Sequence, residues 1–247
     1  MTTKNINISK KIIYLLFLVL FLIGIFTFKD YGISTDEEFQ RSSGLYWLNY
    51  VLNFTPFSEL ASEVSIKFSQ SKTFTVPDVE VYKYYGVIFD LPSALLETLF
   101  KINDPKDYFY LKHFLNFTLF FIAAIFFYKL LFNRFSNQTV ALTGTLFFVL
   151  SPRIYGNSFY NPKDMIFLSL LTMAFYFCFK LFDKMSYKNF LIFGLFCALA
   201  TSQRIWGIFL PLSFIGFYFL SILSKKEDLN YFSGIAFFCI SFCLFLI

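Results

Sequence analysis

The most regular feature of the chain is a series of apolar runs separated by short polar segments. A helix that spans a membrane needs about 20 mostly apolar residues. Seven runs come close to that length, and they are 12–28, 108–131, 138–153, 164–182, 189–203, 205–223 and 231–247. We therefore expect an all-α integral membrane protein with about seven transmembrane helices in one transmembrane domain over 1–247. The last run ends without a flanking charge, so we also expect further spans beyond a truncated C-terminus.

One long polar segment, 29–107, separates the first two apolar runs. It contains two aromatic-rich amphipathic stretches, 36–54 and 84–100. Segments of this kind settle at the lipid headgroups. The second stretch could alternatively span the membrane, but it holds two acids and a proline and would reverse every later loop. We interpret both stretches as juxtamembrane helices and 55–83 between them as a polar loop.

Basic residues alternate along the chain in a way that predicts its orientation. They gather before the first apolar run and in every second connection, whereas 29–107 has twelve acidic and seven basic residues. The basic positions are Lys4, Lys10, Lys11, Lys129, Arg134, Lys180, Lys184, Lys188, Lys225 and Lys226. Cytoplasmic loops are enriched in Lys and Arg. The N-terminus is therefore expected in the cytoplasm, segment 29–107 outside, and the first run as an uncleaved helix.

Composition supports the membrane class and excludes others. Hydrophobic residues make up 57% and charged residues 15% of the chain, less charge than the quarter or so of soluble domains. The net charge of +5 forms no basic patch interleaved with exposed aromatics, so nucleic acid is not an expected partner. All four cysteines lie inside apolar runs, where they are expected to pack as small hydrophobes without disulfide or zinc spacing.

The first polar cluster follows the first apolar run, at Ile33–Gln40. Thr35 and Glu38 have the spacing of a capping box, which predicts the start of a helix. Asp36 and Glu37 would then occupy its first turn, where the helix dipole favours an ionised carboxylate. Such an acid at a membrane surface suits a general base, although it could also serve only as a helix cap.

The second cluster, Ser151–Asp164, is expected on the same external side. Asn161 is a candidate N-cap and Pro162 a first helical residue, so Asp164 falls in the first turn. Arg153 and Lys163 bring positive charge to this cluster. Each could bind a substrate, or the two cations could snorkel to headgroups and the acid could act only as a cap.

The third cluster, Thr201–Gly207, forms the expected tight turn between two apolar runs. Arg204 lies there near the membrane boundary, where an ionisable residue is costly and by default indicates function. The planar guanidinium of Arg suits a phosphate, such as that of a lipid at the interface. The carboxylates of the first two clusters could serve a hydroxyl acceptor or a divalent cation, for which Asp164 is the candidate ligand.

This order of motifs resembles that of membrane glycosyltransferases with the GT-C fold, in particular protein O-mannosyltransferases and lipid A aminoarabinose transferases. Those proteins carry an Asp-Glu motif after the first span, as Thr35–Phe39 does here. Tyr110–Asn116 is similar to the opening of their second span, and Ser151–Asp164 to their second external loop. Gly194–Arg204 is similar to their fifth span, although Gln203-Arg204 stands where they commonly carry Lys.

The resemblance implies transfer of a sugar from a polyprenyl-phosphate-linked donor to an acceptor protein, glycan or lipid at the external face. It implies Asp36, with Glu37, as the catalytic acidic pair, and Asp36 as the base on the acceptor hydroxyl. The substrate-binding residues that it implies are Arg153, Lys163, Asp164 and Arg204. It also implies the inner (plasma) membrane of a bacterium as the location.

Two other functions stay open at this stage. A non-enzymatic multi-pass protein, such as a transporter fragment, would carry ionisable residues near the bilayer midplane and often repeated halves. This chain has no internal repeat, and its polar clusters fall at one expected face. A lipid-linked oligosaccharide polymerase or ligase would share the phosphate-binding cations but need no acid in the first loop.

Overall fold

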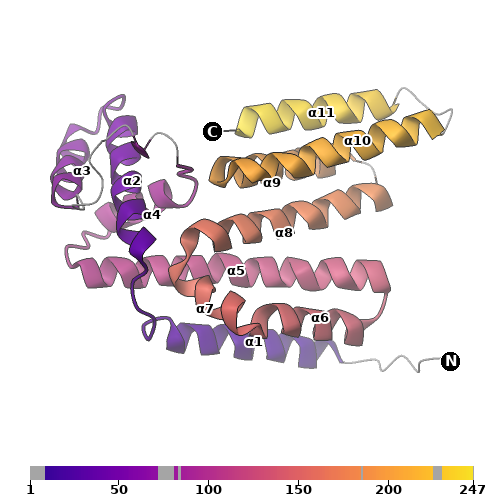
Figure 1. The fold of residues 1–247 in the computed structure, drawn as a ribbon, viewed down its shortest axis with the longest axis horizontal. Coiled ribbons are helices and arrows are strands. Elements are labelled where there is room, and N and C mark those ends of the chain that lie inside the picture. Colours follow the sequence, from indigo (N-terminus) through magenta and orange to yellow (C-terminus); the bar gives the residue numbers. More distant parts are fainter. Residues whose placement is uncertain (1–8, 72–80, 83–84, 185, 225–229, 247) are drawn as a thin grey trace. The chain divides into compact units, whose positions relative to one another are not determined.

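The computed structural model describes residues 9–71, 81–82, 85–184, 186–224 and 230–246, and the regular structure in these ranges is helical throughout (Figure 1). This confirms the predicted all-α fold. The helices are α1 (Lys10–Thr27), α2 (Thr35–Leu52), α3 (Ser58–Gln70), α4 (Asp90–Leu99), α5 (Pro105–Phe135), α6 (Gln138–Leu150), α7 (Pro152–Tyr160), α8 (Pro162–Asp183), α9 (Tyr187–Gln203), the 3₁₀ turn η2 (Ile205–Ile208), α10 (Phe209–Ser224) and α11 (Asn230–Phe245).

The apolar runs coincide with helices. Within the described ranges, α1, α5 and α8 are long and apolar enough to cross a membrane, and α6 and the segment Ile205–Phe217 are shorter apolar helices. These helices identify an integral membrane protein. The count of seven crossings stays a prediction, because the remaining helices are shorter than a full bilayer span.

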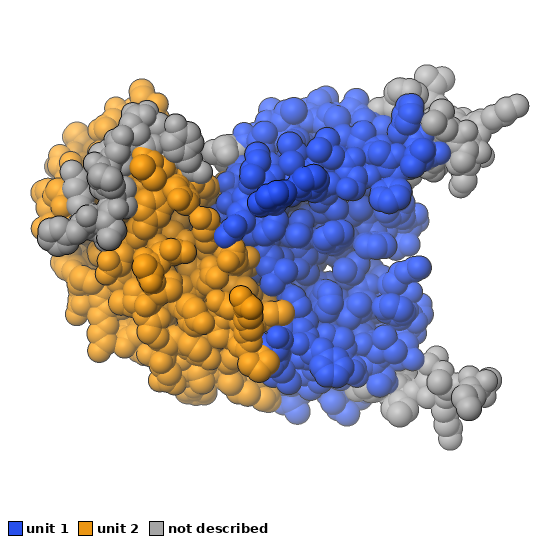
Figure 2. All heavy atoms as spheres, viewed as in Figure 1, with its two compact units in different colours: residues 1–17, 121–151, 167–247 blue, residues 18–120, 152–166 orange. Residues whose placement is uncertain are grey.

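The chain divides into two compact units, coloured separately in Figure 2. Unit 1 comprises 1–17, 121–151 and 167–247, and unit 2 comprises 18–120 and 152–166. The single domain expected over 1–247 stays a prediction, and each unit is described by itself.

The core of unit 1 is aromatic and joins α8, α9, α10 and α11. The ring of Phe193 on α9 is 4.8 Å from that of Phe214 on α10 and 5.0 Å from that of Phe238 on α11. Cys178 and Cys197 are buried in this core as free thiols, which confirms their role as small apolar residues. The hydroxyl of Ser241 donates to the Leu191 carbonyl oxygen at 2.7 Å, so its polar group is satisfied inside the core.

In unit 2, helix α2 packs against α3 and α4 (Figure 1). The expected apolar stripe of α2 is buried there, with Leu45 fully inaccessible and Val64 of α3 beside it. The interpretation of 55–83 as a polar loop was wrong for 58–70, which forms α3, whereas 72–80 and 83–84 lie outside the described residues. The predicted helix over 84–100 is shorter than expected, since α4 begins at Asp90.

Candidate functional site

The first turn of α2 carries the acids that the sequence singled out. The N-cap is Ser34, whose backbone N–H donates to Glu37 Oε2 at 2.8 Å. The predicted capping box of Thr35 and Glu38 was therefore displaced by one residue. A tertiary contact accounts for this, because the Ser34 hydroxyl donates to the Tyr160 carbonyl oxygen at 2.8 Å and holds Ser34 in an extended conformation.

This register separates the two neighbouring acids. Asp36 is exposed to solvent, whereas Glu37 is completely buried. A carboxylate buried in this way needs a partner, because an unpaired buried charge costs several kcal/mol, in general on the order of 3–5 kcal/mol when one partner of a buried pair is lost. The partner of Glu37 is His113 on α5, whose Nε2 lies 3.1 Å from Oε1 and 3.3 Å from Oε2.

The other ring nitrogen of His113 also has a partner. Nδ1 lies 3.3 Å from the carbonyl oxygen of Phe28, one residue past the end of α1. His113 therefore connects the end of α1 to the start of α2. Its place near the start of an apolar run suggests an interfacial polar residue, but its exposed fraction is 1%.

A second buried ion pair lies beside the first. Lys112 Nζ is 3.0 Å from Asp90 Oδ1 at the start of α4 and 3.5 Å from Gln40 Oε1 on α2. Burial raises the pKa of the Asp90 carboxyl, against the opposing effect of Lys112; the negative charge of Glu37 adds to the rise and Lys163 reduces it. These electrostatic effects place Asp90, Glu37 and Lys163 in one charged neighbourhood.

A third ion pair, Arg41–Glu97, joins α2 and α4. The guanidinium of Arg41 on α2 binds the buried carboxylate of Glu97 on α4 through both Nε and Nη2, with Nε at 3.3 Å from Oε2. The same guanidinium stacks 4.6 Å from the ring centre of Tyr108 on α5. Two-point binding and stacking are geometries that Arg supports and Lys does not.

The junction of α7 and α8 carries the second set of candidates. Asn161 caps α8 as predicted, since its Oδ1 accepts from the Asp164 N–H at 3.1 Å, and its Nδ2 donates to Asp164 Oδ2 at 3.1 Å. Lys163 lies with its Nζ 4.4 Å from the ring centre of Tyr85. Asp164 and Arg153 are exposed, and α7 replaces what the sequence suggested was a loop.

Two hydrogen bonds hold this junction against the rest of unit 2. The Ser34 hydroxyl binds the Tyr160 carbonyl oxygen, and the buried amide of Asn116 on α5 donates to the Phe159 carbonyl oxygen at 3.0 Å. The structure therefore brings the α2 start, with its two acids, to the junction that carries Lys163 and Asp164.

Arg204 belongs to unit 1. It is the C-cap of α9 in an extended conformation, its N–H donates to Ala200 O at 3.0 Å, and Gly207 N–H donates back to its carbonyl oxygen at 2.8 Å. This confirms the predicted tight turn between two apolar helices. Gly207 is required there, because a Cβ on it would lie 2.5 Å from the backbone nitrogen of Thr201.

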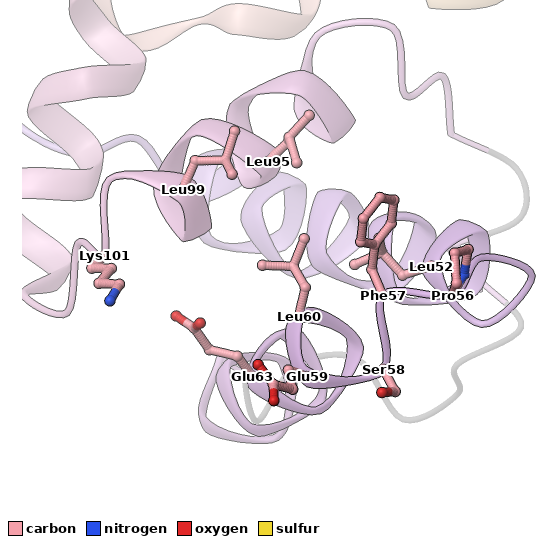
Figure 3. Close-up of a pocket in the computed structure, with 10 residues that line it drawn as sticks. All are labelled: Leu52, Pro56, Phe57, Ser58, Glu59, Leu60, Glu63, Leu95, Leu99 and Lys101. Atoms are coloured by element: carbon pink, nitrogen blue, oxygen red, sulfur yellow. The ribbon is translucent and has the colours of Figure 1, made fainter.

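We compared these residues with possible metal sites and with a cavity in unit 2. Within the described part of the chain, no three His, Cys, Asp or Glu side chains lie close enough to hold a metal ion. A cavity of about 820 Å³ opens between α2, α3 and α4, with leucines on its walls and Glu59, Glu63 and Lys101 at its edge (Figure 3). None of the candidate residues lines it.

Sequence reasoning missed most of the buried charges, although their spacing gave a signal. The buried polar positions recur at helical intervals on three helices, and they are Glu37 and Gln40 on α2, Asp90, Ser93 and Glu97 on α4, and Lys112, His113 and Asn116 on α5. Polar residues three or four apart share one helix face. Helices α2, α4 and α5 each carry such a polar face, and together the three polar faces indicate a buried polar interior.

Comparison with known proteins identifies the class. Residues 107–247, more than half of the chain, match the family model described as dolichyl-phosphate-mannose-protein mannosyltransferase. The helical fold and this match define an integral membrane glycosyltransferase of the GT-C type. The chain belongs to the dolichyl-phosphate-mannose-protein mannosyltransferase family. Neither a search of curated proteins nor a search of solved structures returns a match.

Proposed function

We propose that the protein transfers a sugar from a polyprenyl-phosphate-linked donor to a hydroxyl acceptor, on a protein, glycan or lipid, at the external face of the membrane. The membrane is the inner membrane of a bacterium, and the N-terminus is cytoplasmic. Family membership supports the use of a lipid-phosphate sugar donor. The alternation of basic and acidic loops supports the orientation.

One observation carries the proposal. An exposed carboxylate, Asp36, stands on a helix start that is anchored by a completely buried neighbour, Glu37. The Ser34–Tyr160 hydrogen bond joins this helix start to the junction with Lys163 and Asp164. A base, a cation and a second acid are therefore held on backbone segments that contact each other directly.

The chemistry follows from these groups. Asp36 accepts the proton of the acceptor hydroxyl from the first turn of α2, where the helix dipole favours negative charge. Lys163 and Arg153 stabilise the charge that develops on the departing lipid phosphate. Asp164 orients the acceptor or a divalent cation. Direct displacement by the activated hydroxyl inverts the sugar carbon, by the logic of inverting glycosidases.

Arg204 is proposed as a further donor-phosphate residue, on evidence from its own unit. It ends an apolar helix and lies next to Trp206 and Ile205, both exposed, as expected for a turn at the lipid boundary. Arg204→Ala should raise the KM for the lipid donor by about tenfold, the loss of one charge-assisted hydrogen bond. An unchanged KM would refute this role for Arg204.

The test compares two exposed acids in the first turn of α2, Asp36 and Glu38. Asp36→Asn in the full-length protein, assayed with polyprenyl-phosphate-linked sugars, should lower turnover by roughly 10²–10⁴-fold, the usual contribution of a general base. Glu38→Gln changes an exposed neighbour and should leave turnover close to wild type. Near-normal turnover of Asp36→Asn would refute the assignment. Loss of activity on chelation would add a cation at Asp164 to the site.

A further inference from the structure

The environment of His113 determines which protons its ring carries. Nδ1 faces the Phe28 carbonyl oxygen, which can only accept a hydrogen bond. Nε2 faces both oxygens of the Glu37 carboxylate at 3.1 and 3.3 Å. A neutral imidazole has one N–H, whereas both nitrogens of this ring have an oxygen acceptor opposite them.

Two independent features of its surroundings favour the ionised form of Glu37. Its Oε2 accepts the Ser34 backbone N–H at 2.8 Å, and it lies in the first turn of α2, where the helix dipole favours negative charge. An ionised carboxylate has no proton to donate to Nε2. The ring must therefore supply that proton itself.

Three other charged groups lie around this pair. Asp90 on α4 is close enough for Glu37 to influence its titration, and Lys112, next to His113 on α5, pairs with Asp90 at 3.0 Å. Lys163 at the start of α8 also acts on Asp90. With Asp90 paired to Lys112, the imidazolium is the cation in direct contact with Glu37.

We infer that His113 is a positioning residue, held as a doubly protonated imidazolium between the Phe28 carbonyl and the Glu37 carboxylate, which fixes the first turn of α2 and the direction of Asp36. Loss of the Nε2 proton leaves the buried Glu37 without its charged donor. The helix start then loses its tie to α5, while the Ser34 hydrogen bonds remain. The protonation state stands on the geometry alone, and the effect on turnover rests on the proposed function.

The protonation state can be read directly, because His113 is the single histidine of this chain. In protein labelled with ¹⁵N-histidine and placed in lipid nanodiscs, NMR at pH 7 should show both ring nitrogens protonated. Glu37→Gln removes the carboxylate that faces Nε2, so it should lower the ratio of imidazolium to neutral imidazole at that pH. A neutral ring in the wild type would overturn the inference. So would a spectrum that Glu37→Gln leaves unchanged.

Kinetics test the positioning role. His113→Gln keeps a donor of one hydrogen bond but carries no positive charge. Turnover should therefore fall about 100-fold at neutral pH with the donor KM unchanged, the usual effect of a misplaced catalytic group. The variant should also lack the loss of turnover that we expect in the wild type once the imidazolium gives up its Nε2 proton. Thr118→Ala is the matched control, because its hydroxyl bonds only the Phe114 carbonyl oxygen within α5. A wild-type rate and pH profile in His113→Gln would overturn the positioning role.

The two proposals fail in different ways. If wild-type protein transfers sugar from no polyprenyl-phosphate donor, the proposed function fails while the NMR signature of the imidazolium persists. If transfer occurs and the ring is neutral, the inference about His113 fails while the function stands. A His113 variant that does not fold leaves the wild-type spectrum and the Glu37→Gln spectrum as the deciding measurements.

Discussion

Asp36 and Glu37 are adjacent in the chain, yet their surroundings give them different chemistry. Because α2 begins directly after Ser34, Glu37 faces α5 and Asp36 is exposed to solvent. A group that must meet an acceptor hydroxyl needs exposure, whereas a group that positions it needs burial and a fixed partner. Under the proposed function, these two tasks fall to neighbouring residues.

Removal of one member of the Arg41–Glu97 pair should destabilise the fold. Glu97 is completely buried, so Glu97→Ala leaves the Arg41 guanidinium next to Tyr108 without its counter-ion. Loss of one partner of a buried pair typically costs about 3–5 kcal/mol, whereas loss of both partners is often nearly neutral. Thermal unfolding in detergent should show a large loss for Glu97→Ala and a partial recovery in Arg41→Met/Glu97→Leu. Additive effects of the two changes would refute the coupling.

The titration of Asp90 should make stability depend on pH. Burial raises the pKa of this carboxyl, so between its ordinary value and the raised one the folded state holds a proton that the unfolded state has lost. The free energy of unfolding contributed by Asp90 therefore falls as pH rises through that window. Asp90→Asn should flatten the dependence of the unfolding temperature on pH there. Asp107→Asn, an exposed acid, should leave the wild-type slope, and an equal slope in both variants would contradict the prediction.

The sequence predicted the candidate acids and cations but not the groups that pair with them. Asp36 and Asp164 were singled out because helix-cap rules depend on short spacings, and Lys163 because it brings positive charge to the same polar cluster. His113 lies 76 residues from its partner Glu37, and Lys112 lies 72 residues from its partner Gln40, and no local rule relates such positions. The sequence shows only that polar residues recur at helical spacing, which indicates a buried polar face but does not predict which residues pair.

At the scale of elements, the contact between α2 and α4 depends on a glycine. A Cβ on Gly44 would lie 2.4 Å from the carbonyl oxygen of Asp90, and a backbone atom cannot move aside as a side chain can. Gly44→Ala should therefore push the helices apart and cost about 1–3 kcal/mol, the usual effect of overpacking. Gly32→Ala is the control, since a Cβ added there would meet nothing within 4 Å. Equal unfolding temperatures for the two variants would contradict this account.

The apolar runs predicted the positions of the apolar helices well, but the helices of the polar segment 29–107 were predicted less well. Each of the seven apolar runs coincides with helix. A segment surrounded by lipid or by core side chains must satisfy its backbone hydrogen bonds internally, and a helix does this. Helix α3 was missed because its serines suggested a loop. Its Leu60 and Val64 nevertheless lie four residues apart on one face, and Lys67 pairs with Glu63 at 3.6 Å. Those i, i+4 relations were the signal for a helix.

At the scale of the whole molecule, charge is distributed between the two expected sides of the membrane. Segment 29–107 carries an excess of acidic residues, and three of its acids, Glu37, Asp90 and Glu97, are buried against basic side chains of unit 2. Its remaining acids contribute little to orientation, because the rule counts Lys and Arg rather than net charge. The orientation therefore depends on the basic connections, which a labelling experiment can locate.

Cysteines introduced one at a time at exposed positions should react with a maleimide from opposite sides of the membrane. Cys178 and Cys197 are buried and can stay, while Cys239 and Cys243 are changed to Ser to lower the background. The exposed reporter positions are Ser62→Cys, Arg153→Cys, Asn133→Cys and Lys184→Cys. A membrane-impermeant maleimide added outside should react with the first two, and with the last two only after permeabilisation, because Lys129, Arg134 and Lys188 hold their connections in the cytoplasm. Labelling of Ser62→Cys and Arg153→Cys in different compartments would contradict the topology, since Ser34 and Tyr160 of the same unit are joined by a hydrogen bond.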